Sequence, residues 1–147
     1  MTTVAEVMTR GVRTLTPNDS VVQAAQAMDE LNVGVIPVCE GEKLVGMVTD
    51  RDIVVRGVAQ GGELKTTKLA DVMSAHVRCA QETDDVEQVL SEMAEAQIRR
   101  LPVVDGNQRL VGIVSLGDIA AKGGSMDDTE VAASLGDISS PAEPDRG

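Results

Sequence analysis

Residues 4–56 read VAEVMTRGVRTLTPNDSVVQAAQAMDELNVGVIPVCEGEKLVGMVTDRDIVVR. Residues 69–122 repeat this pattern as LADVMSAHVRCAQETDDVEQVLSEMAEAQIRRLPVVDGNQRLVGIVSLGDIAAK. The halves align at a constant offset until one extra residue near Gln108 shifts the alignment by one position. A repeated unit of this length predicts a repeat architecture, in which each unit buries an apolar face against the other. A pseudo-twofold cleft is expected between the two units.

The composition predicts a compact domain with an aliphatic core. A chain of 147 residues is long enough to bury a substantial core. The hydrophobic share of 42% is ordinary, but the chain contains no Phe, Tyr or Trp. The core must therefore be built from Val, Ile, Leu, Ala and Met.

The charge of the chain argues against several classes of partner. The formal net charge is −11 at pH 7, whereas proteins that bind nucleic acids gain affinity by neutralising phosphates with Lys and Arg. We therefore expect no nucleic-acid partner and no binding to anionic membranes. No apolar stretch approaches the roughly 20 residues of a transmembrane helix, and MTTVAEVMTR does not have the pattern of a signal peptide. These features predict a cytoplasmic protein.

Residues with metal-binding or catalytic potential are sparse. Cys39 and Cys79 are too few and too far apart for a zinc site or a disulfide framework. We expect both to be small reduced residues in or near the core, with a redox switch as the alternative. His76 is the only histidine, so neither a metal site nor a nucleophile–histidine arrangement is expected. The sequence therefore predicts a protein that is not an enzyme.

The periodicity of each repeat predicts elements in the order β-α-β-β-α. The elements expected in the first repeat are an extended segment at 12–16, a helix with Val21, Ala24, Ala25, Met28 and Leu31 on its apolar face and Gly34 after its end, strands at 35–39 and 44–48, and a helix at 52–56. Those expected in the second are a strand at 77–80, a helix carrying Val86, Val89, Leu90 and Met93, strands at 101–104 and 110–114, and a helix at 118–122. Short strands that alternate with helices indicate a mixed α/β fold class.

We divide the chain into a first repeat at 1–58, a linker at 59–68, a second repeat at 69–122 and a tail at 123–147. The tail is acidic and rich in Gly, Ser and Pro, with few apolar residues. We expect it to be largely disordered, with one short helix at 127–135. A docking peptide is the alternative interpretation of the tail.

A short motif occurs once in each repeat, where the last strand meets its helix: glycine, an apolar residue, any residue, Thr or Ser, any two residues, and Asp. It stands as GMVTDRD at 46–52 and as GIVSLGD at 112–118. A hydroxyl at a helix start is suited to a phosphate, and the following Asp can accept hydrogen bonds from both hydroxyls of a ribose. The motif therefore favours a nucleoside phosphate as ligand. A single copy is more typical of an ordinary helix cap, but two copies at equivalent positions of the repeats favour the ligand.

Together with its flanking strands, the motif resembles that of a tandem pair of CBS domains, the Bateman module. The resemblance covers about residues 1–122. Its marks are IPV at 36–38, LPVV at 101–104, LVG at 44–46 and at 110–112, and the two hydroxyl–Asp motifs. It implies two β-α-β-β-α repeats packed with pseudo-twofold symmetry into one module.

The resemblance also implies a ligand of the adenosine type, bound in the cleft between the repeats. AMP, ADP, ATP and S-adenosylmethionine are all open, and no cofactor is required. By the motif match, Thr49 and Ser115 would contact phosphate, and Asp52 and Asp118 would hold ribose. Adenine would lie on aliphatic side chains and backbone, since no aromatic ring is present. The residues expected near adenine are Thr14, Val35, Ile36, Ile98 and Leu101.

In the family a basic residue before the Leu-Pro-Val strand often reaches the phosphates, and the resemblance maps this role to Arg99 and Arg100. The alternative is that these arginines form a solvated helix end. The first repeat has Gly34 and Val35 in their place, and Arg51, beside Asp52, is the candidate that compensates.

Two functions are open at this point. The first is a stand-alone regulatory module, similar to small bacterial proteins of the hypoxic response type. It would be a homodimer that signals ligand binding to a downstream protein by a conformational or oligomeric change. The second is a ligand-free scaffold for protein interaction or dimerisation in a stress or hypoxic response, in which the motifs are only helix caps.

Overall fold

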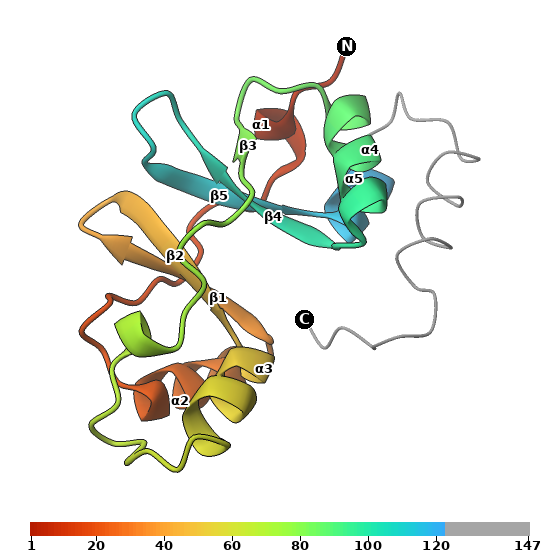
Figure 1. Cartoon of the computed structure of the whole chain (residues 1–147). Coiled ribbons are helices and arrows are strands. Elements are labelled where there is room, and N and C mark those ends of the chain that lie inside the picture. Colours follow the sequence, from red (N-terminus) through yellow and green to blue (C-terminus); the bar gives the residue numbers. More distant parts are fainter. Residues whose placement is uncertain (123–147) are drawn as a thin grey trace. The chain divides into compact units, whose positions relative to one another are not determined.

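The structure, a computed structural model, describes residues 1–122 (Figure 1). The expected helix at 127–135 and the expected tail lie outside the described residues. Within them, the chain forms two compact units. We call residues 13–77 the first-repeat unit, and residues 1–12 together with 78–122 the second-repeat unit. Both combine helices with short strands, which confirms the mixed fold class.

The first-repeat unit is built on an antiparallel hairpin of β1 (Val35–Glu40) and β2 (Lys43–Thr49). Before the hairpin lies helix α2 (Val21–Leu31). After it, α3 (Asp50–Asp52) continues directly into the π-helical turn η1 (Ile53–Val58). The expected extended segment at 12–16 is reduced to one parallel bridge, from Leu15 to Val38.

The second-repeat unit has a three-stranded sheet. Strand β3 (Ala80–Gln81) runs parallel to β4 (Arg100–Val104), which pairs antiparallel with β5 (Leu110–Ser115). Helix α4 (Val86–Ala96) precedes β4, and α5 (Leu116–Lys122) follows β5.

Helix α2 shows how local sequence sets its limits. Ser20 and Gln23 form a reciprocal cap at the start, in which the Gln23 backbone N–H donates to Ser20 Oγ over 3.1 Å. The helix ends at Asn32, whose left-handed φ of 55° ends it before Gly34. The expected apolar face is wrong at two positions, because Ala25 is exposed and Leu31 is 43% exposed. Residue 25 is turned about 100° from Ala24, and Leu31 is the last residue of the helix.

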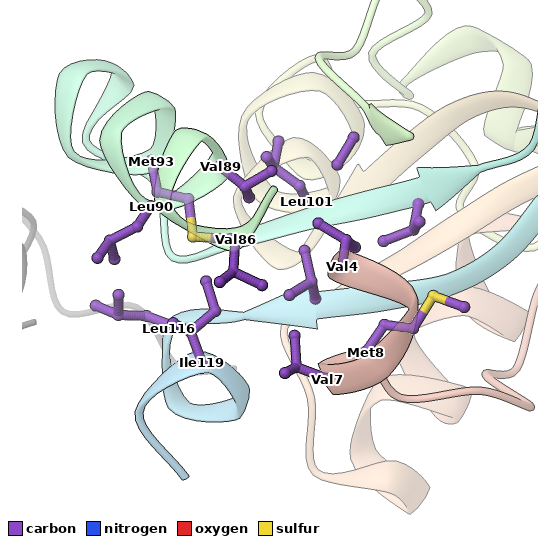
Figure 2. Close-up of a cluster of buried hydrophobic side chains, with 13 residues drawn as sticks. Val4, Val7, Met8, Val86, Val89, Leu90, Met93, Leu101, Leu116 and Ile119 are labelled. Carbon is purple, nitrogen blue, oxygen red and sulfur yellow. The ribbon is translucent and has the colours of Figure 1, made fainter. Parts of the chain in front are cut away.

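Each unit has its own hydrophobic cluster, made of aliphatic side chains and methionine. Figure 2 shows the cluster of the second-repeat unit, in which side chains from α4, α5 and the sheet surround those of helix α1 (Val4–Val7). Val4 and Val7 are fully buried there. Close packing of aliphatic side chains therefore fills the core without any aromatic residue.

The start of the chain completes the second-repeat unit, although the repeat pattern assigns it to the first. The Thr9 backbone N–H donates to Ile113 O over 2.8 Å, and the Ile113 N–H donates back over 3.0 Å. Residues 69–77 do the same for the first-repeat unit, where Ser74 and Met47 exchange bonds of 2.9 and 3.0 Å. The two segments carry the same apolar pattern, VAEVMT and LADVMS, so each can seal a hairpin of the same kind.

Helix α1 and the short turn η2 (Leu69–Asp71) belong to these sealing segments. The sequence did not predict them, because four and three residues are too few to show a helical period.

The glycine of each Leu-Val-Gly run makes this close contact possible. A Cβ at Gly46 would lie 2.7 Å from Ser74 O, and one at Gly112 would lie 2.6 Å from Thr9 O. Both neighbours are backbone atoms held in their bridges, so they cannot turn aside.

We predict that Gly112→Ala and Gly46→Ala each lower the free energy of unfolding by about 1–3 kcal/mol, as in other overpacked sites. The control is Gly106→Ala, because a Cβ there meets no atom within 4 Å. Urea denaturation followed by circular dichroism measures all three. Equal stability of the three variants would show that the contact has no energetic importance.

Candidate functional site

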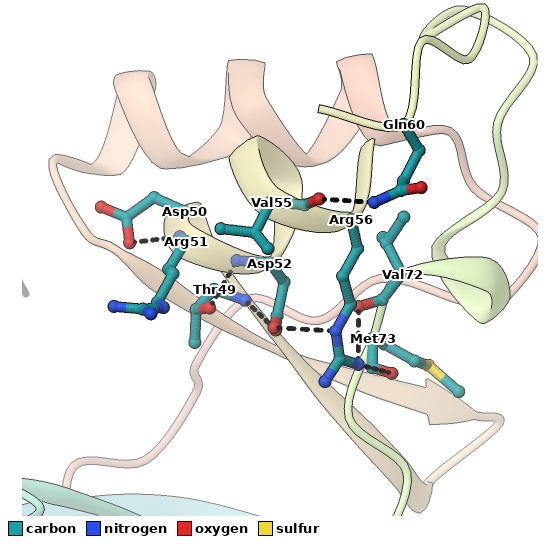
Figure 3. Close-up of polar contacts among 9 residues, drawn as sticks. All are labelled: Thr49, Asp50, Arg51, Asp52, Val55, Arg56, Gln60, Val72 and Met73. Atoms are coloured by element: carbon teal, nitrogen blue, oxygen red, sulfur yellow. Dashed lines mark hydrogen bonds and ion pairs between the residues drawn. The ribbon is translucent and has the colours of Figure 1, made fainter. Parts of the chain in front are cut away.

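The hydroxyl–Asp motif of the first-repeat unit forms a closed pair of hydrogen bonds (Figure 3). The Asp52 backbone N–H donates to Thr49 Oγ1 over 3.0 Å, and the Thr49 N–H donates to Asp52 Oδ2 over 3.0 Å. This reciprocal cap fixes the junction between β2 and α3. The Asp52 side chain is 14% exposed, and Arg56 Nε lies 4.0 Å from its Oδ1. Arg56 also donates to the carbonyls of Val72 and Met73.

The second-repeat unit has the same arrangement at Ser115 and Asp118. The Asp118 N–H donates to Ser115 Oγ, and the Ser115 N–H donates to Asp118 Oδ2, both over 3.0 Å. Lys122 Nζ lies 3.9 Å from Asp118 Oδ1. Thr9 Oγ1 lies 3.4 Å from each carboxylate oxygen and donates to them. In both units, a hydroxyl, a carboxylate and a cation one helical turn further on therefore lie together.

The cap does not use up the capacity of these groups. An ionised carboxylate has about four acceptor positions, and a hydroxyl that accepts a bond keeps its own hydrogen for donation. The cap takes one carboxylate oxygen and one acceptor position of the hydroxyl. The same residues can therefore cap the helix and receive a ligand, so the two interpretations of the motif do not exclude each other.

The structure places Arg99 and Arg100 beside the second motif. Helix α4 ends at Ala96, so both residues lie beyond it and the alternative of a solvated helix end is wrong. Arg100 opens β4 and is the cross-strand partner of Ser115. The Arg99 carbonyl accepts the N–H of Leu116, the first residue of α5.

In the first-repeat unit the corresponding places belong to Gly34 and Val35. The Gly34 carbonyl accepts the Asp50 N–H over 3.0 Å, and Val35 is the partner of Thr49. Arg51 lies within the motif, on α3, and is exposed.

The residues expected near adenine divide into two kinds. Ile36 and Leu101 are each only 1% exposed and belong to the hydrophobic clusters, so their side chains face the core. Only their backbone atoms suit contact with a ligand. Val35 and Ile98 are half-buried, and Thr14 is exposed.

Three residues that contact the motif carboxylates were missed from the sequence. Arg56 and Lys122 follow Asp52 and Asp118 by four residues, a helical spacing that could have identified them. Thr9 gave no such signal, because 109 residues separate it from Asp118 in the chain.

The described residues hold no group of three His, Cys, Asp or Glu side chains arranged to bind a metal ion. Among residues 1–122, no helix has the length and apolar character needed to cross a bilayer.

The cysteines lie as expected, in or near the core. Cys39 is buried on β1, and Cys79 is partly buried just before β3. Loss of hydration raises the pKa of both thiols above the usual value. Both side chains therefore favour the neutral form.

Comparison with known proteins gives the family. The family model for the CBS domain matches residues 4–57 and 69–123. Hypoxic response protein 1 of Mycobacterium tuberculosis is 36% identical over 121 residues, which are 82% of this chain and 84% of the relative. The chain therefore belongs to the CBS-domain family, as a tandem pair of the Bateman type. The predicted resemblance is confirmed.

Solved structures that resemble this chain include complexes with adenosine compounds. CBSX2 in complex with AMP is 26% identical, with a TM-score of 0.73 over 82% of this chain and 95% of that chain. The CBS domain pair of protein MJ0100 is in complex with 5′-methylthioadenosine and S-adenosyl-L-methionine. It is 30% identical, with a TM-score of 0.71 over 84% of this chain and 97% of that chain.

The cap geometry predicts a stability effect that depends on the substitution. Asp118→Ala leaves the Ser115 N–H without its acceptor and should cost about 1 kcal/mol of unfolding free energy. Asp118→Asn keeps an oxygen in place and should cost clearly less. Thermal denaturation compares the two variants. Equal losses would mean that the cap contributes nothing beyond the charge.

The burial of the thiols predicts slow alkylation. Because the thiolate is the reactive form, iodoacetamide should modify the folded protein slowly at neutral pH and faster as the pH rises above the usual pKa of cysteine. Cys79 should react before the buried Cys39, and both should react rapidly in denaturant. Mass spectrometry follows each site. Fast modification of the folded protein at neutral pH would instead support the redox-switch alternative.

Proposed function

We propose that this protein is a stand-alone regulatory module that binds an adenosine-type ligand at its hydroxyl–Asp motifs. The observation that carries the proposal is the repetition of one polar arrangement. Thr49 with Asp52 and Ser115 with Asp118 form reciprocal caps with matching distances of 3.0 Å, each with a nearby cation. A helix cap alone needs no such cation.

Each part of the ligand has a matching group. The ribose hydroxyls donate to the carboxylates of Asp52 and Asp118, which keep acceptor positions beyond the cap. The hydroxyls of Thr49 and Ser115 can each donate to an acceptor at the 5′ position of the ligand, of which phosphate is one kind. Adenine packs on aliphatic and backbone atoms near Thr14, Val35, Ile36, Ile98 and Leu101.

The ligands of related proteins support the same class. AMP is bound by CBSX2, and 5′-methylthioadenosine and S-adenosyl-L-methionine by the MJ0100 pair. Their shared part is adenosine with an intact ribose diol. We therefore place AMP, ADP, ATP and S-adenosylmethionine among the candidate ligands for this chain, as regulatory signals rather than cofactors.

We further propose that the output is a shift of population and not catalysis. A ligand favours one conformational or oligomeric state by the difference between its affinities for the two states. In this proposal the protein is a cytoplasmic homodimer, and a downstream protein reads the change.

The second candidate function is a ligand-free interaction scaffold. It is favoured by the fact that both motifs already serve the fold as helix caps. The two candidates differ in one property, which is whether the motif carboxylates contribute binding energy to a soluble adenosine compound.

A dye-based thermal shift assay separates them. AMP, ADP, ATP, S-adenosylmethionine and NAD are tested at millimolar concentration against the full chain. A ligand at 100 times its dissociation constant adds about 2.7 kcal/mol, which raises the melting temperature by roughly 2–4 °C per kcal/mol. We expect such a rise with at least one adenosine compound.

The double variant Asp52→Asn with Asp118→Asn should remove this rise while retaining most of the stability, because Asn preserves an oxygen for each cap. Asp29→Asn, an exposed change on α2, is the matched control and should keep the rise. No shift of the unchanged chain with any compound would favour the scaffold.

A further inference from the structure

The two motifs share a backbone geometry but differ in the residue that follows the hydroxyl. In the first-repeat unit this residue is Asp50, and in the second-repeat unit it is Leu116. Both open the helix after the hairpin, and both donate their N–H to the residue before the first hairpin strand: Asp50 to Gly34 O over 3.0 Å, and Leu116 to Arg99 O over 2.8 Å. The positions are therefore structurally equivalent.

Asp50 puts an additional carboxylate at the first motif. Its Oδ2 lies 3.1 Å from the point that a Cβ of Gly34 would occupy, so the carboxylate rests over this glycine. Its Oδ1 accepts the backbone N–H of Arg51 over 2.9 Å, which fixes its orientation (Figure 3). The side chain is half-buried, and the residue follows Thr49 directly, where β2 ends and α3 begins.

The second motif has the opposite surroundings. Leu116 is only 3% exposed and packs in the hydrophobic cluster, so it brings no charge. Arg99 stands where the first repeat has Gly34. Arg100 lies opposite Ser115 in the register of β4 and β5. Lys122 adds a cation 3.9 Å from the carboxylate of Asp118.

The balance of charge around the two motifs therefore differs. At the first, the carboxylates of Asp50 and Asp52 are balanced by Arg51 and Arg56. At the second, Leu116 replaces the additional carboxylate of Asp50, and Arg99 and Arg100 stand where the first repeat has Gly34 and Val35. A phosphate monoester carries about −1.5 to −2 charges at neutral pH, and a fixed carboxylate close to it raises the free energy of binding.

On the basis of the proposed function, we propose that the two motifs select different classes of adenosine compound. The Ser115–Asp118 motif binds a compound that carries phosphate, such as AMP. The Thr49–Asp52 motif binds one without negative charge at the 5′ position, such as a nucleoside thioether or a sulfonium compound. Asp50 is the residue that sets this preference, because it excludes phosphate and tolerates a neutral or cationic group.

The test measures each motif separately by isothermal titration calorimetry with two probes, AMP and 5′-methylthioadenosine. Asp118→Asn weakens the second motif, so the binding that remains belongs to the first. Asp52→Asn does the reverse. We expect the Asp118→Asn protein to bind 5′-methylthioadenosine more tightly than AMP, and the Asp52→Asn protein to show the opposite order.

A second variant tests the assigned cause. Asp50→Asn, added to Asp118→Asn, should raise the affinity for AMP by roughly three- to tenfold, in keeping with a partly screened charge pair. The affinity for 5′-methylthioadenosine should change by less than about twofold on the same grounds. Asp29→Asn in the same background is the matched control. Conversely, Arg99→Gln with Arg100→Gln in the Asp52→Asn background should weaken AMP alone, and the melting temperature of every variant checks that it is folded.

The outcomes separate this inference from the proposed function. If neither probe nor any other adenosine compound binds the unchanged chain, the proposed function fails and the inference fails with it. If the probes bind but both motifs show the same order of preference, or if Asp50→Asn changes both probes equally, the inference alone is overturned.

Discussion

The backbone pairing that seals each hairpin is the contact on which the other features depend. Thr9 pairs with Ile113, and Ser74 pairs with Met47, in each case across the glycine of a Leu-Val-Gly run. The pairing brings the apolar segment that starts one repeat onto the second hairpin strand of the other repeat. That strand leads into the helix that the hydroxyl–Asp motif caps. Without it, the strand would lack a partner on that edge, and Val4 and Val7 would have no cluster to enter.

The motif itself combines a structural and a binding role in the same atoms. A reciprocal cap holds the hydroxyl and the carboxylate in a fixed geometry before any ligand arrives, so ordering these side chains costs a ligand little entropy. The cap leaves acceptor positions on the carboxylate. A cation lies 4.0 Å from it in the first-repeat unit and 3.9 Å from it in the second. The two units differ in residues next to these atoms, where Asp50 corresponds to Leu116 and Gly34 to Arg99.

The sequence predicted most of what is local and periodic. Helices α2 and α4, the two hairpins and both motifs lie within a few residues of their expected places. Their limits follow from local signals, namely the spacing of apolar residues and the turn residues between the elements. Ala25 and Leu31 were misplaced because a period defines a face but not its edges. The role of the first 12 residues was missed for another reason: the repeat pattern records similarity between segments and not which segment packs on which.

The same limit applies to the site. Arg56 and Lys122 could have been found from helical spacing, whereas the contact of Thr9 with Asp118 depends on how the chain is folded over a long distance. The placement of the Ile36 and Leu101 side chains in the core, which leaves only their backbone atoms for contact with adenine, also needed the packing of the strands to be known.

The exchange of the sealing segments has a consequence for how the protein reaches its structure. Contacts between residues far apart in the chain slow folding, because the loop that joins them must close first. The bridge from Thr9 to Ile113 spans nearly the whole described chain, while the bridge from Met47 to Ser74 is much shorter. On a ribosome, the first-repeat unit has all its residues once position 77 has emerged, whereas residues 1–12 must wait for the second hairpin. These two segments therefore assemble in the reverse of their order along the chain: residues 1–12 are synthesised before residues 13–77 but find their place after them.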